Sequence, residues 1–211
     1  MAAATTAREA IGILLSYGLG CLSGGYYVVR LLKGQDIRQS GSGSTGAKNV
    51  GRLLGPAGFT ATFVFDLLKG GLAVWAGQRL GFGAITLTLV LLAVVAGHIW
   101  PAQLGFRGGK GVSTAFGGVL FYNPWFALVM IVVFAVALAL TRRSVVAGML
   151  AFVIGPWAGL AWGLPLWQAL GTFLLSLLIL AAHRDNLRQE WEKRPRGGTR
   201  ERTSAQAEGK P

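Results

Sequence analysis

The sequence predicts an all-α integral membrane protein, and three observations support this class. Of the 211 residues, 53% are hydrophobic and only 13% are charged, whereas an average soluble domain is about 25% charged. Long apolar runs recur along the chain, as expected of helices that cross a membrane. A transmembrane β-barrel would instead need segments of about ten residues with alternating hydrophobicity, and the sequence lacks that pattern.

The apolar runs predict seven transmembrane helices, of which the fourth is short. The first covers residues 11–32, spans roughly 33 Å as a helix and is too long for the apolar region of a signal peptide. The fourth has about ten residues, or ~15 Å, and Asn123-Pro124 is predicted to end it. One tilted helix over residues 112–140 would give six spans instead. The other predicted helices are residues 56–78, 82–100, 112–121, 125–140, 145–162 and 166–183.

Basic residues follow every second predicted helix, which indicates the orientation of the chain. The formal net charge is +12, and cytosolic loops of membrane proteins are enriched in Lys and Arg. The N-terminus is therefore expected outside and the C-terminus in the cytosol, and the charge requires no nucleic-acid partner. The clusters are Arg30, Lys33, Arg38, Lys48 and Arg52, then Arg107 and Lys110, then Arg142 and Arg143, then Arg184 and Arg188.

Residues 1–188 are expected to form a single polytopic membrane domain. Residues 189–211 are charged and lack apolar periodicity, so they are predicted to be a disordered cytosolic tail that contacts anionic lipid headgroups. Cys21 is the only cysteine, which excludes an intramolecular disulfide bond. No Cys/His cluster has the spacing of metal ligands, and neither a metal nor another cofactor is expected.

Three polar stretches of the sequence share residue types that bind phosphate. The first, residues 40–52, contains Gly41, Ser42, Gly43, Asn49 and Arg52. Its glycines let backbone amides approach an anion, and an arginine can hold phosphate through two hydrogen bonds. A flexible linker is the alternative interpretation. The dinucleotide-binding fingerprint that it also matches needs a βαβ unit, which is not predicted here.

The second stretch joins Gly97-His98 to the glycine-rich residues 107–114. It resembles a nucleotide-binding P-loop but has the wrong spacing, and Lys110 is not followed by Ser or Thr. A glycine loop before a helix N-terminus still suits an anion, and Lys110 adds a positive charge. Glycine-mediated helix packing is the alternative. His98 is either a direct participant or a histidine hydrogen-bonded to a carbonyl, and Thr114 is a supporting residue.

The third stretch is His183-Arg184-Asp185-Asn186, at the end of the last predicted helix. One helical turn places His183 and Asn186 on the same face, where they could orient or deprotonate a hydroxyl. A histidine that only stabilises the helix end is the alternative. Asp66 and Lys69, three residues apart inside a predicted span, are expected to pair with each other.

Together these stretches resemble the three motifs of the bacterial acyl-phosphate-dependent glycerol-3-phosphate acyltransferases, the PlsY family. The resemblance extends from about Gly18 to Arg188, with the same motif order and spacing. It implies a multi-pass protein of the bacterial inner membrane with its active site facing the cytosol. It also implies transfer of a fatty acyl group from acyl phosphate to the 1-hydroxyl of glycerol 3-phosphate. The products are lysophosphatidate and phosphate, in the first step of phospholipid synthesis.

The resemblance also implies roles for individual residues. Ser42, Arg52, Lys110 and Asn186 would bind glycerol 3-phosphate, and Gly108, Gly109, Gly111 and His183 would hold the acyl phosphate. Transfer would be direct, without a covalent intermediate, and substrate-assisted, since a phosphate oxygen helps to remove the hydroxyl proton. His183, Lys110 and Asn186 are the predicted catalytic residues, in a protein expected to be a monomer among membrane lipids. The supporting residues are Gly41, Gly43, Asn49, His98 and Thr114.

The chain departs from the family pattern at four positions. Ser44 stands where asparagine is usual, Lys48 where threonine is usual, and Ala182 where arginine commonly precedes the histidine. The substrate-binding serine of the family would fall at Val145, and Ser144 is turned by about 100° from that position on a helix. Because of these departures, an inactive relative stays open as an alternative. A membrane carrier for phosphorylated solutes is a second alternative, since interrupted spans and basic loops would suit it, but a carrier needs access from both sides.

Overall fold

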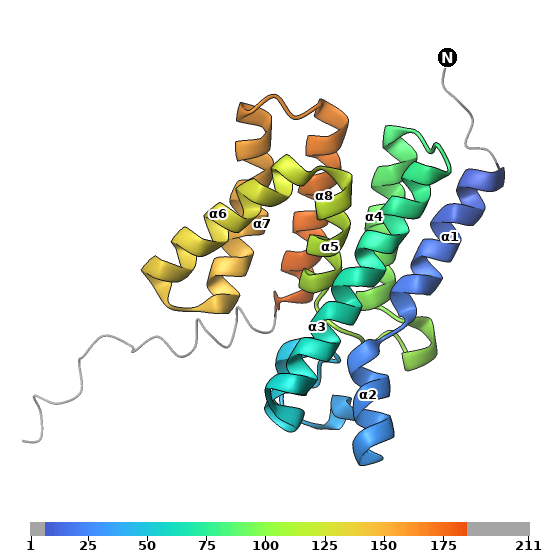
Figure 1. Ribbon diagram of the computed structural model, residues 1–211, viewed down its shortest axis with the longest axis vertical. Helices are drawn as coiled ribbons and strands as arrows, with labels where there is room; N and C mark the ends of the chain where they lie inside the picture. The colour runs from blue at the N-terminus through green and yellow to red at the C-terminus, as the bar shows by residue number, and fades with distance from the viewer. Residues whose placement is uncertain (1–6, 185–211) are drawn as a thin grey trace, which may run out of the picture.

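The computed structural model describes residues 7–184, and within this range all regular structure is helical. Figure 1 shows the helices running roughly along a common direction, with connections at two ends. Asn186, Arg188 and the predicted tail lie outside the described residues. Five helical segments of this range are long and apolar enough to cross a membrane. Two shorter apolar helices are Val112–Tyr122 and Leu166–Ala182.

The first predicted span is divided into two helices, α1 (Ala7–Cys21) and α2 (Gly24–Lys33). The prediction of one unbroken helix over residues 11–32 is wrong at Leu22 and Ser23, which are not helical. The break is stabilised from outside the segment, because the ammonium of Lys69 donates hydrogen bonds to the carbonyls of Gly20 (3.0 Å) and Leu22 (2.8 Å). These carbonyls lie at the end of α1, where intrahelical donors run out.

Helix α3 (Ala47–Arg79) begins nine residues earlier than the predicted start at Pro56 and contains a sharp break. Gly55 has φ +72° and ψ −166°, a conformation open to glycine because it has no Cβ. Pro56 cannot donate a backbone hydrogen bond at this point. The break separates a short amphipathic segment, which carries Lys48 and Arg52, from the long apolar part of α3.

The other helices agree with the predicted spans. They are α4 (Ala84–Ile99), α5 (Val112–Tyr122), α6 (Pro124–Thr141), α7 (Ser144–Ala161) and α8 (Leu166–Ala182), with short 3₁₀ turns at Ile37–Gln39 and Ala102–Leu104. The predicted break at Asn123-Pro124 is confirmed: the Asn123 side chain caps α6 by accepting a hydrogen bond from the Phe126 N–H (3.1 Å). The alternative of one helix over residues 112–140 is therefore wrong.

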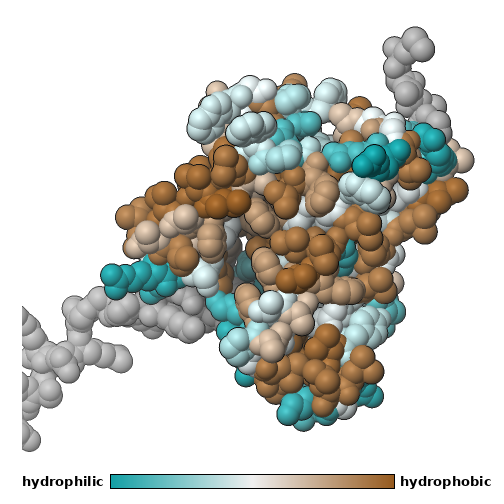
Figure 2. Space-filling view, in the orientation of Figure 1, coloured by the Kyte–Doolittle hydropathy of each residue, from teal (hydrophilic) through white to brown (hydrophobic). Residues whose placement is uncertain are grey.

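The helices pack as two groups that share α8. Helix α3 packs on α5 and α1 packs on α4, whereas α6 and α7 form a hairpin that stands to one side (Figure 1). Helix α8 contacts both α7 and α4 and so connects the groups. In Figure 2, hydrophobic surface runs across α6, α3 and α1, as expected of side chains that face lipid.

Glycines bring the helices of the first group unusually close together. A Cβ placed on Gly117 of α5 would lie 2.0 Å from the carbonyl oxygen of Leu67 in α3, and one on Gly70 would lie 2.0 Å from that of Thr114. At the α1–α4 crossing, a Cβ on Gly97 would lie 2.1 Å from the carbonyl oxygen of Tyr17. Small residues at crossings allow the backbone contact that drives helix association in membranes.

We expect Gly117→Ala to destabilise the protein by about 1–3 kcal/mol, because the added methyl group would overpack a backbone contact. Gly148→Ala on α7 is the matched control, since a Cβ there meets no atom within 4 Å and alanine favours helix. Thermal unfolding in detergent measures both. Equal midpoints for the two variants would contradict the close crossing of α3 and α5.

Candidate functional site

The first polar stretch is a compact loop held by the amide of Asn49. The Asn49 Nδ2 donates to the carbonyls of Ser40 and Ser44, both at 2.9 Å, and its Oδ1 accepts from the Ser42 N–H at 3.0 Å. Gly41 (φ +59°) adopts a left-handed conformation, and a Cβ there would lie 2.3 Å from Asn49 Oδ1. Asn49 is 3% exposed, so it shapes the loop and presents Ser42, which is exposed.

The side chains of Arg38 and Ser44 stabilise this loop. The guanidinium of Arg38 pairs with Asp36 (2.6 Å) and donates to the carbonyl of Leu104 (2.5 Å), in the second polar stretch. The hydrogen bond from Arg38 holds the pKa of the Asp36 carboxyl below its ordinary value. Ser44, one of the departures from the family pattern, accepts a hydrogen bond from the Gly46 N–H at 3.2 Å. A serine at this position therefore supports the loop itself.

The second polar stretch forms a glycine loop, residues 108–111, which folds back against the end of α4. The Gly108 N–H donates to the Ile99 carbonyl and the Gly109 N–H to the His98 carbonyl, both at 3.0 Å. No side chain fits at either glycine: a Cβ would lie 2.1 Å from the His98 carbonyl oxygen at Gly108 and 2.0 Å from His98 Nε2 at Gly109. These two amides are thus engaged within the protein.

The glycine loop leads directly into the N-terminus of α5. Gly111 has φ +82° and precedes Val112, the first residue of α5. The first N–H groups of a helix have no intrahelical acceptor, and they carry the positive end of the helix dipole. Thr114 is fully buried in this first turn. The predicted anion cradle is therefore the N-terminus of α5 together with Lys110.

The first and second stretches are joined by a backbone hydrogen bond. The Thr45 N–H donates to the Gly108 carbonyl at 3.2 Å. Thr45 is buried, and its hydroxyl lies 3.3 Å from that of Ser23 at the α1–α2 break. This contact links residues that are far apart in the sequence, and it brings the serine loop beside the glycine loop.

The third stretch begins at the end of α8, which packs beside the glycine loop. His183 follows the last residue of α8 and is 6% exposed, and its Nδ1 lies 2.8 Å from the Ile179 carbonyl. Because a carbonyl only accepts, Nδ1 carries the proton of the neutral ring and Nε2 has the lone pair. A Cβ on Gly111 would lie 2.8 Å from Ile179 Cδ1, so the glycine loop packs against this turn.

The surroundings of His183 favour its neutral form. Burial lowers the pKa of its imidazole below the ordinary value of 6.5, and the positive charge of Lys110 lowers it further, whereas the hydrogen bond with Ile179 acts in the opposite direction. Asn186 lies outside the described residues, so its predicted role stays a prediction.

Arg52 and Lys48 lie one turn apart on α3 and line a hollow of about 310 Å³. Gly51, Gly55, Pro56 and Phe59 complete its wall. Lys48 Nζ also donates to the hydroxyl of Ser144 at the start of α7 (3.2 Å). Two departures from the family pattern, Lys48 and the shifted serine, therefore contact each other across the two helix groups.

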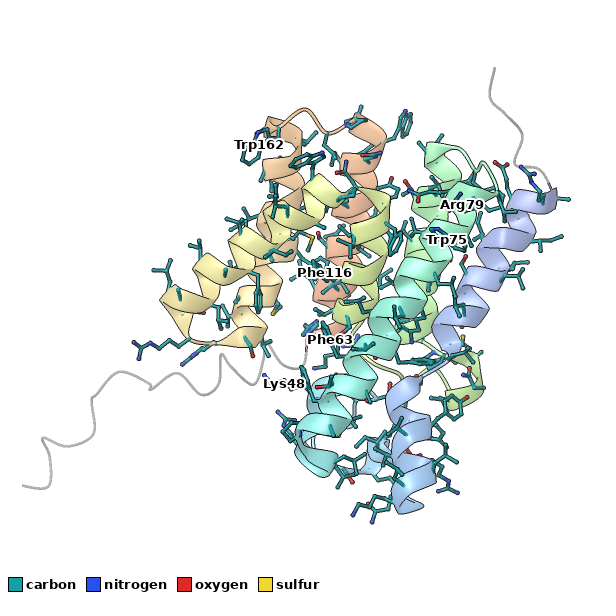
Figure 3. The ribbon with its side chains drawn as sticks, in the orientation of Figure 1. Lys48, Phe63, Trp75, Arg79, Phe116 and Trp162 are labelled. Atoms are coloured by element: carbon teal, nitrogen blue, oxygen red, sulfur yellow. The ribbon has the colours of Figure 1, made fainter. Side chains whose placement is uncertain are left out.

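The described residues of the three polar stretches lie at one end of the helix bundle, opposite the end from which α1 starts (Figure 1). In Figure 3, Lys48 lies toward this end, whereas Trp75, Arg79 and Trp162 lie toward the other. The side chain of His98 points into the interior, where it contacts Lys69 (2.9 Å) and Asp66 (3.4 Å). The predicted Asp66–Lys69 pair is confirmed at 2.9 Å. Within residues 7–184, no group of three or more His, Cys, Asp or Glu side chains is placed to hold a metal.

We expect replacement of His183 to change the pH dependence of stability. Since the folded-state pKa is below 6.5, the unfolded chain binds the proton more readily, and wild-type stability should fall as the pH drops below 6.5. This group contributes a slope of at most about 1.4 kcal/mol per pH unit. His183→Asn should lose that component in thermal unfolding between pH 8 and 5. Parallel curves for the two proteins would contradict a neutral, buried His183.

Comparisons with known proteins agree with the resemblance of the motifs. The sequence model of the family described as glycerol-3-phosphate acyltransferase matches residues 10–193. The chain is 46% identical to glycerol-3-phosphate acyltransferase 1 of Desulfitobacterium hafniense, over 86% of this chain and 90% of that protein. It is 40% identical to a glycerol-3-phosphate acyltransferase of Thermus thermophilus, over 93% of this chain and 96% of that protein.

Solved structures give the same result for the fold. The crystal structure of PlsY, an integral membrane glycerol 3-phosphate acyltransferase, in its glycerol 3-phosphate form has a TM-score of 0.82 and 32% identity. Its lysophosphatidic acid form has a TM-score of 0.79 and 29% identity. Each comparison covers 88% of this chain and 92% of the solved chain. The membrane fold is therefore shared over nearly all of the described residues.

Proposed function

Because this chain belongs to the glycerol-3-phosphate acyltransferase family, we propose that it transfers a fatty acyl group from acyl phosphate to the 1-hydroxyl of glycerol 3-phosphate. The observation that carries the proposal is the meeting of three polar stretches at one end of the bundle. The Thr45–Gly108 hydrogen bond joins the first two, and the close packing of Gly111 against Ile179, whose carbonyl contacts His183, joins the last two. Two phosphate-bearing substrates need such a cationic, glycine-lined site.

Glycerol 3-phosphate is assigned to the side of the site formed by α3 and the serine loop. Arg52 can bind its phosphate through two hydrogen bonds, and it lines the hollow beside the loop that presents Ser42. Lys110 and Asn186 complete the proposed set. The glycerol 3-phosphate form of the related PlsY structure supports this substrate.

The acyl phosphate is assigned to the N-terminus of α5, beside the glycine loop and His183. There the helix N–H groups and Lys110 would bind the phosphate and stabilise charge that develops on the reacting carbonyl oxygen. The acyl chain would lie against hydrophobic helix surface, which explains why the reaction takes place in a membrane protein. His98 supports the loop from the interior.

The reaction is proposed as a direct transfer. The 1-hydroxyl oxygen bonds to the acyl carbon, the bond from that carbon to the phosphate oxygen breaks, and a phosphate oxygen accepts the hydroxyl proton. His183 Nε2, with its lone pair, can accept a hydrogen bond from the hydroxyl and orient it. An acyl phosphate is already activated, so positioning of the two substrates supplies much of the catalysis.

The same arrangement supports the finer topology of seven spans, with the N-terminus outside and the site at the cytosolic face of a bacterial inner membrane. Helices α5 and α8 would add two short spans to the five longer candidates. The clusters at Lys48–Arg52, Lys110 and Arg142–Arg143 then follow the positive-inside rule. A carrier would need anion sites that open to both sides of the membrane, whereas the polar stretches of this protein gather at one end of the helix bundle.

Phosphate release by the purified protein, given palmitoyl phosphate and glycerol 3-phosphate, tests the proposed function. A parallel reaction with palmitoyl-CoA tests the donor. We expect phosphate and lysophosphatidate from the acyl phosphate alone. Product from the acyl-CoA alone would overturn the proposed donor, and folded protein without turnover from either donor would favour the carrier or an inactive relative.

Arg52→Ala and Lys110→Ala should each reduce turnover by at least about a hundredfold, because each removes a cation placed to bind phosphate and to stabilise charge in transfer. Arg79→Ala is the matched control. Arg79 lies at the opposite end of the bundle, with its guanidinium 5.6 Å from the Trp75 ring (Figure 3), and its loss should leave turnover within about twofold. Near-normal turnover in either site variant would contradict the assignment.

A further inference from the structure

We propose that Asp66 and Lys69 are positioning residues for the glycine loop and that they act on it through the ring of His98. This inference rests on the proposed function, because it gives the glycine loop a part in binding acyl phosphate. Asp66 and Lys69 lie inside α3, His98 lies at the end of α4, and none of the three is required by the transfer step itself.

The three side chains form a buried charged cluster. Asp66 is 1% exposed, and Lys69 and His98 are each 3% exposed. Lys69 Nζ lies 2.9 Å from Asp66 Oδ1 and 2.9 Å from His98 Nδ1. Ionisable groups inside a membrane helix are costly and commonly mark function. Packing alone does not account for this cluster, because apolar side chains would fill the same volume at lower cost.

The geometry assigns the tautomer of His98. A lysine ammonium only donates hydrogen bonds, so the 2.9 Å contact makes His98 Nδ1 an acceptor. The longer 3.4 Å separation between His98 Nδ1 and Asp66 Oδ1 agrees with this direction. The neutral ring then carries its proton on Nε2, and the orientation of the ring is set by Lys69, which Asp66 holds in turn.

His98 Nε2 faces the glycine loop. A Cβ on Gly109 would lie only 2.0 Å from this atom, so the ring edge rests directly against the backbone of Gly109. The carbonyl of His98 also accepts the hydrogen bond of the Gly109 N–H (3.0 Å). Residue 98 therefore holds Gly109 by both its ring and its backbone, and a rotated ring would displace the loop.

The cluster also connects the loop to the other side of the site. Lys69 donates to the carbonyls of Gly20 (3.0 Å) and Leu22 (2.8 Å) at the α1–α2 break. The next residue, Ser23, lies 3.3 Å from the hydroxyl of Thr45, whose N–H binds the Gly108 carbonyl. The ammonium of Lys69 is thus connected to the glycine loop by two sets of contacts. One set runs through His98, and the other runs through Ser23 and Thr45.

Steady-state kinetics of the full-length protein in detergent test the inference. Asp66→Asn should lower kcat/KM for palmitoyl phosphate on the order of tenfold to a hundredfold, as small displacements of binding groups do, because the glycine loop that it positions lies beside the proposed acyl-phosphate site. His98→Asn tests the same link without removing a full charge, because it retains an amide near Nδ1 but lacks the ring edge at Gly109.

A double-mutant cycle identifies the contact through which the cluster acts. Gly109→Ala should lose activity because its methyl group meets the His98 ring, and His98→Ala in that background should restore part of it. Tyr122→Phe is the control: it removes a buried hydrogen bond to Thr88 at the far end of α5 and should lower the unfolding midpoint without changing either KM.

The outcomes separate the two proposals. Wild-type protein that forms no product from palmitoyl phosphate would overturn the proposed function and this inference with it. Active wild type with Asp66→Asn and His98→Asn variants that change only the unfolding midpoint, as Tyr122→Phe does, would overturn this inference alone. Losses that simply multiply in the Gly109/His98 cycle would also overturn it.

Discussion

The backbone contact between the glycine loop and the end of α4 is the constraint on which the site depends. Gly108 and Gly109 donate to the carbonyls of Ile99 and His98, and neither position has room for a Cβ. These hydrogen bonds fix the loop against the end of α4, and its last residue, Gly111, leads directly into α5. The carbonyl of Gly108 remains to accept from Thr45 and so fixes the serine loop.

The chemistry of the site follows from this arrangement of donors. Eight acidic residues occur in the whole chain, against twenty basic ones, and Asp66 and Asp36 are each paired with a nearby cation. A site built from amides, hydroxyls and cations is suited to bind two anions and bring them together. His183, neutral and fixed by Ile179, adds one group that can orient a hydroxyl.

Much of the fold could be predicted from local sequence, because the spans are long apolar runs and Asn123-Pro124 is a strong break. The division at Leu22-Ser23 was not predicted, because residues 11–32 resemble one long apolar run and the break is stabilised by Lys69 from another helix. The extra segment of α3 before Gly55 was hidden in a stretch that resembles a linker. A run of Ser and Gly does not show that Asn49 will order it.

In the site, too, local sequence signals could be predicted but contacts between distant segments could not. The motif residues were visible because their types suit phosphate, whereas the partner of His98 was not, since a contact over 29 residues leaves no spacing signal. The Asp66–Lys69 spacing predicted their pair but not its third member. Likewise, Lys48 and Val145 were visible as separate departures, and only the three-dimensional structure shows Lys48 in contact with Ser144.

A structure of the protein with glycerol 3-phosphate and a non-hydrolysable acyl phosphonate tests the central claim most directly. The account predicts the glycerol phosphate on Arg52 and Ser42 and the phosphonate at the start of α5, with Lys110 and His183 beside both. A phosphonate bound away from the α5 N-terminus, or a glycerol phosphate enclosed near the middle of the bundle, would contradict the claim that one cationic end of this protein brings two phosphates together.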